Sequence, residues 1–204
     1  MNLIRVLAIS TVSLFALGAA QGIKGKKWEF ATSVKKAQEA FEGKRYGACL
    51  TELKTTAAEV GKLRAAAILA SFPAAPAGFQ AQEVNNDNNA LGLFAFGSEI
   101  KRDYRKGDET VHFTVMADSP VVAGMQAMFA NPILIAGDKT AEMVTFGANK
   151  GILRVNAEEK TGKLELLIAG AHMLTVEWSG LTRTDIEPLL EEDLVKKIAD
   201  ALSN

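Results

Sequence analysis

The sequence predicts an α+β protein, in which an N-terminal helical hairpin is followed by an antiparallel β-sheet packed against two helices. Apolar residues recur at helical spacing from Trp28 to about Phe72, and strand-like alternation dominates from about Gln80 onward. Pro73 and Pro76 separate the two patterns. The chain has 204 residues, of which 48% are hydrophobic and 23% charged, which is an ordinary globular balance.

Residues 1–20 have the organisation of a secretory signal peptide. Arg5 supplies a positive charge, residues 6–17 form a run of apolar and small side chains, and Gly18 and Ala20 are small residues before a cleavage position. This run is shorter than the roughly 20 residues that a membrane-spanning helix needs. We therefore expect cleavage after Ala20, rather than a retained membrane anchor, and a soluble product in the periplasm or outside the cell.

Residues 21–72 predict the helical hairpin. The first helix places apolar side chains at three- and four-residue steps and stops near Gly43. A longer second helix keeps nearly the same period, and the short connection implies that the two helices are antiparallel. The apolar positions are Phe30, Val34, Ala37 and Phe41 in the first helix, and Tyr46, Leu50, Leu53, Ala57, Val60, Leu63 and Ile68 in the second.

The connection between these helices, residues 40–50, resembles the turn region of a tetratricopeptide repeat. Gly43 stands one residue earlier than in that pattern, and Cys49 stands where alanine is usual. The match occurs once, whereas a solenoid needs about three repeats to bury its faces. We interpret it as a single repeat-like helix pair, and a generic helical hairpin explains the pattern equally well. The residues in register are Ala40, Phe41, Tyr46, Cys49 and Leu50.

Residues 73–80 predict a short Pro-rich linker, and residues 81–204 predict the sheet domain. Two runs of alternating residues flank "KGDE", which is a good hairpin turn, and "EKTG" is another. Such a series is typical of an antiparallel meander with one buried face. The alternating apolar or aromatic positions include Ile100, Tyr104, Val111, Phe113 and Val115, and later strands are expected in "EMVTFG", "GILRVNAE", "GKLELLIAG" and "HMLTVEWSG".

Two helices interrupt or close this series of strands. Ser119 is a plausible N-cap, Pro120 suits the first helical position, and Pro132 ends the helix. The segment "EEDLVKKIADAL" places Leu194, Ile198 and Leu202 along one helix face. The order of elements is loosely similar to exported α+β sandwich domains of the photosystem-associated PsbP type.

Charge and cysteine content exclude several classes of function. The formal net charge is −1 and the two signs are interspersed, so we expect no binding to nucleic acid. We also expect no stable membrane insertion after signal cleavage. Cys49 is the only cysteine, which excludes an intramolecular disulfide, and its apolar setting is typical of a buried small side chain.

The segment "EVNNDNNALG", residues 83–92, has the oxygen-rich composition of a calcium loop. Asn85, Asp87 and Asn89 supply alternating ligands, but the sixth position is Ala90 and the twelfth is Phe96, where an EF-hand needs Gly and Glu. We interpret the segment as a polar turn. No cofactor is expected.

Two other kinds of chemistry stay open as alternatives. Met125 and Met128 form an M-x-x-M pair that, with His112 and His172, could hold copper, although methionine at this spacing usually fills a core. A hydrolase of unrecognised type would need one of the two histidines to face a cleft beside a polar partner. The sequence contains no G-x-S-x-G motif.

The preferred interpretation is an exported, soluble, non-catalytic accessory or protein-interaction protein of the cell envelope, with an envelope protein of unknown identity as partner. The side chains best suited to partner contacts are Trp28, Arg102, Tyr104 and Arg105. The first alternative is a periplasmic carrier of a small ligand or of copper, with its pocket between the sheet and the helix "SPVVAGMQAMF". The second alternative is the hydrolase.

Overall fold

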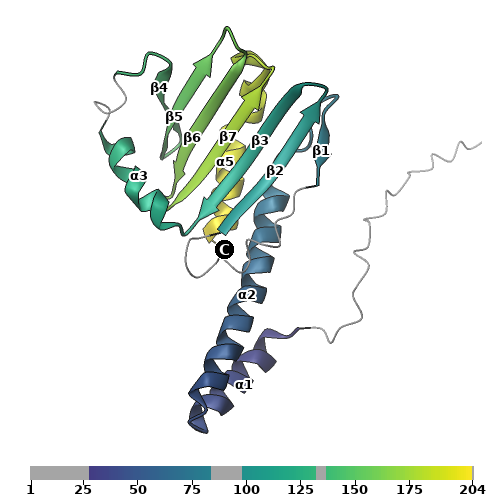
Figure 1. Ribbon diagram of the computed structural model, residues 1–204, viewed down its shortest axis with the longest axis vertical. Coiled ribbons are helices and arrows are strands. Elements are labelled where there is room, and N and C mark those ends of the chain that lie inside the picture. Colours follow the sequence, from purple (N-terminus) through teal and green to yellow (C-terminus); the bar gives the residue numbers. More distant parts are fainter. Residues whose placement is uncertain (1–27, 84–97, 132–136, 204) are drawn as a thin grey trace, which may run out of the picture.

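The computed structural model describes residues 28–83, 98–131 and 137–203. Within these ranges it confirms the α+β class, with two packed helices at the N-terminal end followed by an antiparallel sheet (Figure 1). The expected signal peptide at residues 1–20 lies outside the described residues, and so do Asn85, Asp87 and Asn89 of the polar segment.

The hairpin consists of α1 (Phe30–Glu42) and α2 (Tyr46–Ser71), joined by a tight turn. The backbone N–H of Gly43 bonds the carbonyl of Glu39, as expected for a helix end. Lys44 then adopts a left-handed conformation with φ of 55°, which a glycine would take without steric cost. The chain reverses here, and α1 and the first half of α2 project from the sheet as a stem (Figure 1).

Seven strands form one antiparallel sheet in the order β1-β2-β3-β7-β6-β5-β4. The strands β2 and β3 pair as a hairpin, and so do β4 with β5, β5 with β6, and β6 with β7. The β3–β7 pair joins the first group to the second, so a distant part of the chain closes the sheet. The strands are β1 (Gln80–Gln82), β2 (Ser98–Lys106), β3 (Glu109–Ala117), β4 (Ala141–Phe146), β5 (Asn149–Asn156), β6 (Thr161–Ile168) and β7 (His172–Ser179).

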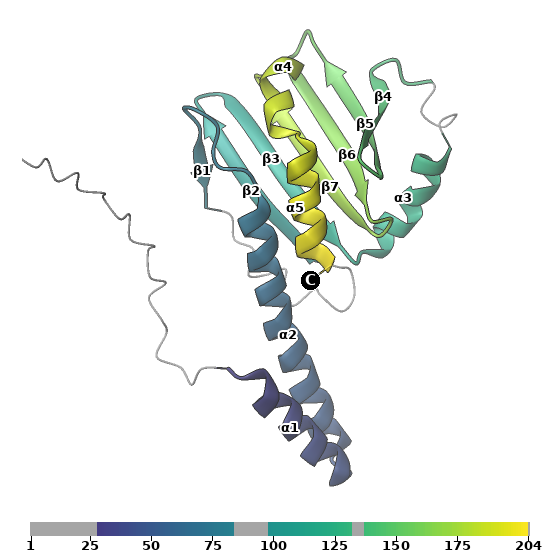
Figure 2. The same cartoon turned by 180° about the vertical axis from the view of Figure 1, so that it is seen from behind.

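One face of the sheet carries the main hydrophobic core. Val111, Phe113 and Val115 alternate along β3 and are completely buried, as the sequence predicts. The C-terminal helix α5 (Glu192–Ser203) lies across this face, with the upper part of α2 beside it (Figure 2). From these helices, Leu194, Ile198 and Leu202 of α5 and Ile68 of α2 enter the same core.

The C-terminal end of α2 is anchored to the core of the sheet. Ile68 and Phe72 belong to the sheet core, and the Tyr104 hydroxyl donates a hydrogen bond to the carbonyl of Pro73. The expected linker at residues 73–80 begins at this anchored proline. The hairpin thus packs on the sheet through the C-terminal part of α2.

The opposite face of the sheet is apolar at one end only. There α3 (Pro120–Ala130) packs through Val122 and Phe129 on Ile152 and Met173. The expected N-cap of this helix is present, since the Val121 N–H donates to the Ser119 hydroxyl oxygen at 3.3 Å. Between β7 and α5 the chain forms α4 (Arg183–Ile186) and the short 3-10 helix η4 (Glu187–Leu189).

Candidate interaction surface

The two helices of the stem meet through small side chains. Ser33, Ala37 and Ala40 of α1 and Cys49 and Thr56 of α2 are buried between them. The Thr56 hydroxyl is satisfied, because it donates to the Glu52 carbonyl at 2.8 Å. Small residues at a helix contact let the two axes approach closely. Val34, Phe41 and Leu50 each directly follow one of these contact residues, and because the two helices are antiparallel they lie on the same side of the pair.

These neighbouring apolar side chains are exposed. Eight large ones on the two helices of the hairpin have between 38% and 64% of their surface accessible to solvent. The sequence correctly predicts their periodicity, but the structure leaves them uncovered instead of placing them in the core. We call this set the hairpin surface: Phe30, Val34, Phe41, Tyr46, Leu50, Leu53, Val60 and Leu63.

Most of the hairpin surface follows a heptad spacing. Steps of four and three residues connect Phe30, Val34, Ala37 and Phe41 in α1, and they continue from Tyr46 through Leu50, Leu53 and Ala57 to Val60 in α2. An average step of 3.5 residues is the seam of a coiled coil, which lets a facing helix pack along its whole length. The rings of Phe41 and Tyr46 touch edge to face, with centroids 5.8 Å apart, and so join the two seams at the turn.

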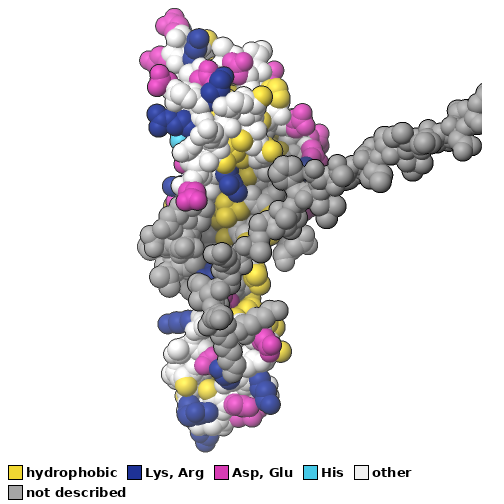
Figure 3. Space-filling view, turned by 90° about the vertical axis from the view of Figure 1, so that its right-hand side faces the viewer, with side chains coloured by type: hydrophobic (Ala, Val, Ile, Leu, Met, Phe, Trp, Pro, Cys, Tyr) yellow, Lys and Arg dark blue, Asp and Glu magenta, His cyan; other side chains and the backbone are white. Residues whose placement is uncertain are grey.

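Charged side chains lie mostly away from these seams. Lys35 pairs with Glu39 and Lys62 with Glu59 on other sides of their helices. Hydrophobic side chains are visible among charged ones on the projecting stem (Figure 3). The five positions that flank the seams on the side away from the other helix are Ala31, Gln38, Gly47, Lys54 and Gly61, of which only Lys54 is charged.

Comparisons of the chain with protein-family models, with curated proteins and with solved structures found no match. The resemblances to a tetratricopeptide repeat and to PsbP-type sandwich domains therefore stay predictions. Among the helices of the described ranges, none is both long and apolar enough to cross a membrane.

The residues expected to contact a partner do not form one patch. Tyr104 is buried against Phe113, and burial raises the pKa of its hydroxyl. Arg102 is half-buried on the same side of the sheet, whereas Arg105 projects from the opposite side and donates to the Gly107 carbonyl at 2.9 Å. Only Trp28 lies beside the hairpin surface, where the centroid of its ring is 6.2 Å from the centroid of the Phe30 ring.

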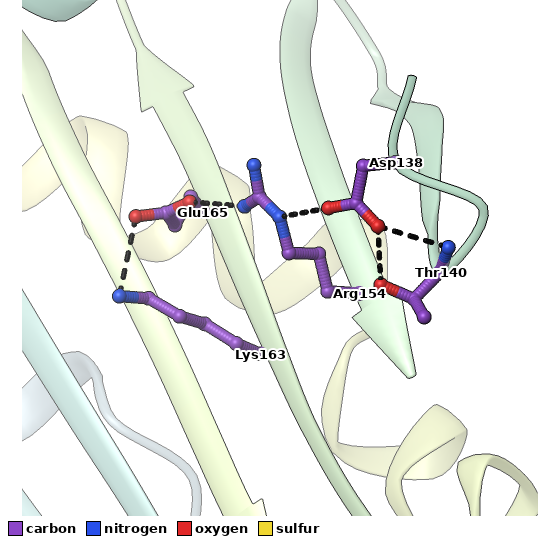
Figure 4. A network of polar contacts seen from close by, with 5 residues as sticks. All are labelled: Asp138, Thr140, Arg154, Lys163 and Glu165. Carbon is purple, nitrogen blue, oxygen red and sulfur yellow. Dashed lines mark hydrogen bonds and ion pairs between the residues drawn. The ribbon is translucent and has the colours of Figure 1, made fainter. Parts of the chain in front are cut away.

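The open face of the sheet carries a network of ion pairs (Figure 4). Arg154 contacts Asp138 at 3.1 Å and Glu165 at 2.6 Å. Lys163 contacts Glu165 at 3.2 Å and Glu177 at 3.1 Å. Both cations of this network are paired with two carboxylates, so neither is left to attract an anion.

Hydrogen bonds tune the charges of this network. The Thr140 hydroxyl and N–H donate to Asp138, and with Arg154 they hold the pKa of that carboxyl below its usual value. Burial opposes charge on Lys163, but Glu177 and Glu165 outweigh it and raise the pKa of the amine. A shallow hollow of about 280 Å³ beside the network is lined by Thr140, Arg154, Asn156, Thr161, Lys163 and Glu177, among others.

Each of the two histidines has a carboxylate neighbour, but neither histidine lines one of the hollows found in the described part of the structure. His112 Nδ1 lies 2.9 Å from Asp103 Oδ1 on the open face of the sheet. His172 Nδ1 accepts a hydrogen bond from the Asp118 N–H at 3.3 Å. The pKa of His172 is lowered, mainly because the ring is partly buried. The Asp118 carboxylate acts in the opposite direction, and the Arg64 guanidinium, which pairs with Asp118, adds to the lowering. Neither histidine lines the hollow beside the ion-pair network or two smaller hollows near α4.

The candidate copper ligands divide between the two sides of the sheet. Met125 packs on the apolar cluster of Met173, together with Met116, which is the cross-strand partner of Met173. His172 precedes Met173 in the strand and therefore points to the other side. His112 shares a side with Met116 but stands roughly 13 Å away along the strand.

The structure thus joins three methionines and separates them from both histidines. The side chain of Met128 lies outside the described part of the structure. Within that part, no group of three or more His, Cys, Asp and Glu residues could hold a metal ion.

Proposed function

We propose that this chain is an exported, soluble accessory protein of the cell envelope that binds an α-helical protein partner through the hairpin surface and does not act as an enzyme. The observation that carries the proposal is the exposure of eight large apolar side chains on two adjacent helices. Because these side chains have heptad spacing, the partner segment that packs on them is expected to be helical.

The size of the surface supports a binding role. Aromatic side chains bury about 150–250 Å² each, so residues of this size at these exposures leave roughly 100 Å² apiece in water, or about 800 Å² in total. The largest apolar patch on a monomeric protein is usually about 300–600 Å². Burying apolar area is favourable by about 25 cal/mol per Å², and part of that gain offsets the freedom of motion that is lost on association.

The N-terminal sequence supports the proposed location. Residues 1–20 contain a positive residue, an apolar run and a small-residue cleavage position, in the order of a signal peptide. Cys49 is the only cysteine and is buried in the hairpin, so it has no partner thiol in the same chain in an oxidising compartment. A carrier of copper or a small ligand and a hydrolase stay alternative predictions, and the separated histidines and methionines favour neither of them.

The proposal is tested with the full chain, purified as its own cells process it. Native mass spectrometry of the wild type should show a complex, whereas a double variant, Leu50→Glu with Leu53→Glu, should show the free chain. The matched control places the same two charges on the other side of α2, as Ala48→Glu with Thr55→Glu, and should keep the complex. A wild-type chain that is free of any partner at every concentration would contradict the proposal.

Cell fractionation and the mass of the mature N-terminus test the location separately. The expected product begins at Gln21 and is found outside the cytoplasm. A full-length chain that begins at Met1 and stays in the cytoplasm would contradict export without affecting the interaction surface.

A further inference from the structure

We infer that the partner on the hairpin surface is a second copy of this chain, so that two stems pack face to face as a symmetric four-helix bundle. The inference rests on the proposed binding function and names its partner. It follows from the geometry of the two seams, the area that they expose and the distribution of charge around them.

A pair of helices has one apolar side here, with heptad spacing in both α1 and α2. A second pair with the same pattern closes the arrangement, because each of the four helices then faces two others across a common core. A second copy supplies that pair without further requirements.

Stable protein interfaces bury about 800 Å² on each partner, which equals the rough area of the hairpin surface. In a two-fold symmetric dimer, the same surface is used on both subunits and must be self-complementary. Aliphatic and aromatic side chains of mixed size meet this condition more easily than a patterned set of charges, because apolar contacts have no sign.

In a symmetric dimer, the charges near the axis meet charges of the same sign on the other copy, which opposes association. Ala31, Gln38, Gly47 and Gly61 flank the seams without charge, and Lys54 is the exception. At Gly47 a side-chain β-carbon would meet no atom within 4 Å, so a second stem can approach the backbone closely. A neutral border of this kind fits a second copy better than a partner selected by opposite charge.

One of the extra apolar residues of α2 fits the same arrangement. Val60 and Leu63 lie beyond the level at which α1 begins, so α1 of the same chain does not reach them. In a bundle of two stems, a helix of the second copy that runs past this level covers Val60, which continues the seam of α2, whereas Leu63 lies about 120° round the helix from Ala57. The bundle therefore includes the seam of α2 as far as Val60.

Sedimentation equilibrium of the processed full chain tests the inference. The wild type should have the mass of two chains, and the same protein with Ala48→Glu and Thr55→Glu should keep it. Leu50→Glu with Leu53→Glu should weaken association at least 100-fold and give the mass of one chain, with an unchanged circular dichroism spectrum. The milder Leu53→Ala should weaken association about tenfold, which keeps the test valid if the charged variant misfolds.

Three results overturn the inference in distinguishable ways. A wild type in which one chain is bound to a different protein, and in which Leu53→Ala releases that protein, rejects the second copy but supports the binding function. A wild type with the mass of one chain and no bound protein rejects both. A dimer that survives Leu50→Glu with Leu53→Glu shows that the copies meet at another surface.

Discussion

The rings of Phe41 and Tyr46 meet edge to face across the hairpin turn, with their centroids 5.8 Å apart, although each is more than half exposed. An aromatic pair of this geometry contributes about 0.5–1.5 kcal/mol beyond the area that it buries. The pair thus links α1 to α2 while most of its apolar surface stays available to a partner.

Truncating this pair should affect association more than folding. Phe41→Ala with Tyr46→Ala should lower the free energy of unfolding of the dilute single chain by about 1 kcal/mol. The control Phe113→Ala, in the core of the sheet, should lower it by about 3–5 kcal/mol. Urea denaturation followed by circular dichroism measures both, and equal losses in the two variants would show that the aromatic pair is part of the folded core.

The turn of the stem offers a stabilising substitution. Lys44 has φ of 55°, a conformation that costs a residue with a β-carbon about 1–2 kcal/mol. Lys44→Gly should therefore raise the free energy of unfolding by about 1 kcal/mol, measured by thermal or urea denaturation. Lys44→Ala removes the same charge but keeps the β-carbon, so it should change stability by less than about 0.5 kcal/mol. Equal effects of glycine and alanine would mean that the charge, not the backbone conformation, is responsible.

A side chain at Gly162 of β6 would clash with the core of the sheet. A β-carbon at Gly162 would lie 2.1 Å from Cζ2 of Trp178 on the neighbouring strand β7. Gly162→Ala should lower the free energy of unfolding by about 3 kcal/mol and change the near-ultraviolet circular dichroism of the displaced indole. Gly124→Ala, in α3 where a β-carbon meets nothing within 4 Å, is the control and should stabilise by up to about 1 kcal/mol. A Gly162→Ala variant as stable as the wild type would contradict this packing.

The ion-pair network should contribute through coupling between its members. Glu165 is largely buried, with 12% of its side chain exposed, and it bonds both Arg154 and Lys163. Arg154→Leu alone should lower the free energy of unfolding by about 1–2 kcal/mol, because Glu165 loses one of its two cations. Arg154→Leu with Glu165→Leu should cost less than the sum of the two single variants, as a double-mutant cycle in urea measures. Additive effects would show that the pair is not coupled.

Stability should fall as the pH is lowered through the range in which histidine titrates. Burial lowers the pKa of His172 below the 6.5 that is usual for histidine, so the folded chain binds fewer protons at this site than the unfolded chain. The stability that His172 contributes is therefore present above about pH 6.5 and is lost as the pH falls towards the folded pKa. His172→Gln should remove this part of the pH dependence, measured as the difference between the two unfolding curves from about pH 8 to 5. If His172 of the folded chain titrates at or above about pH 6.5 in an NMR experiment, the predicted loss of stability at low pH would be contradicted.

The elements themselves were predictable because their causes are local. The alternation of Val111, Phe113 and Val115 defines a strand with one buried side, and Ser119 before Pro120 defines a helix start. The apolar period of α1 and α2 likewise follows from steps of three and four residues. These patterns depend on neighbours within a few positions, so the sequence alone determined the class, the order of the longer elements and which face of each is apolar. The short elements β1, α4 and η4 were not predicted, because segments of three or four residues are too short to show a period.

The tertiary structure decided what lies against each face. The pairing of β3 with β7 and the contact of Arg64 with Asp118 join residues more than fifty positions apart in the chain. Tyr104, expected to contact a partner, is instead buried against Phe113, and its hydroxyl donates to the carbonyl of Pro73, which follows α2. Leu50 and Ile68 both occupy apolar positions of α2, yet only Ile68 reaches the core of the sheet. Periodicity shows that a face is apolar, whereas the presence of a covering element depends on how distant segments pack, and for Leu50 the proposed cover is another chain.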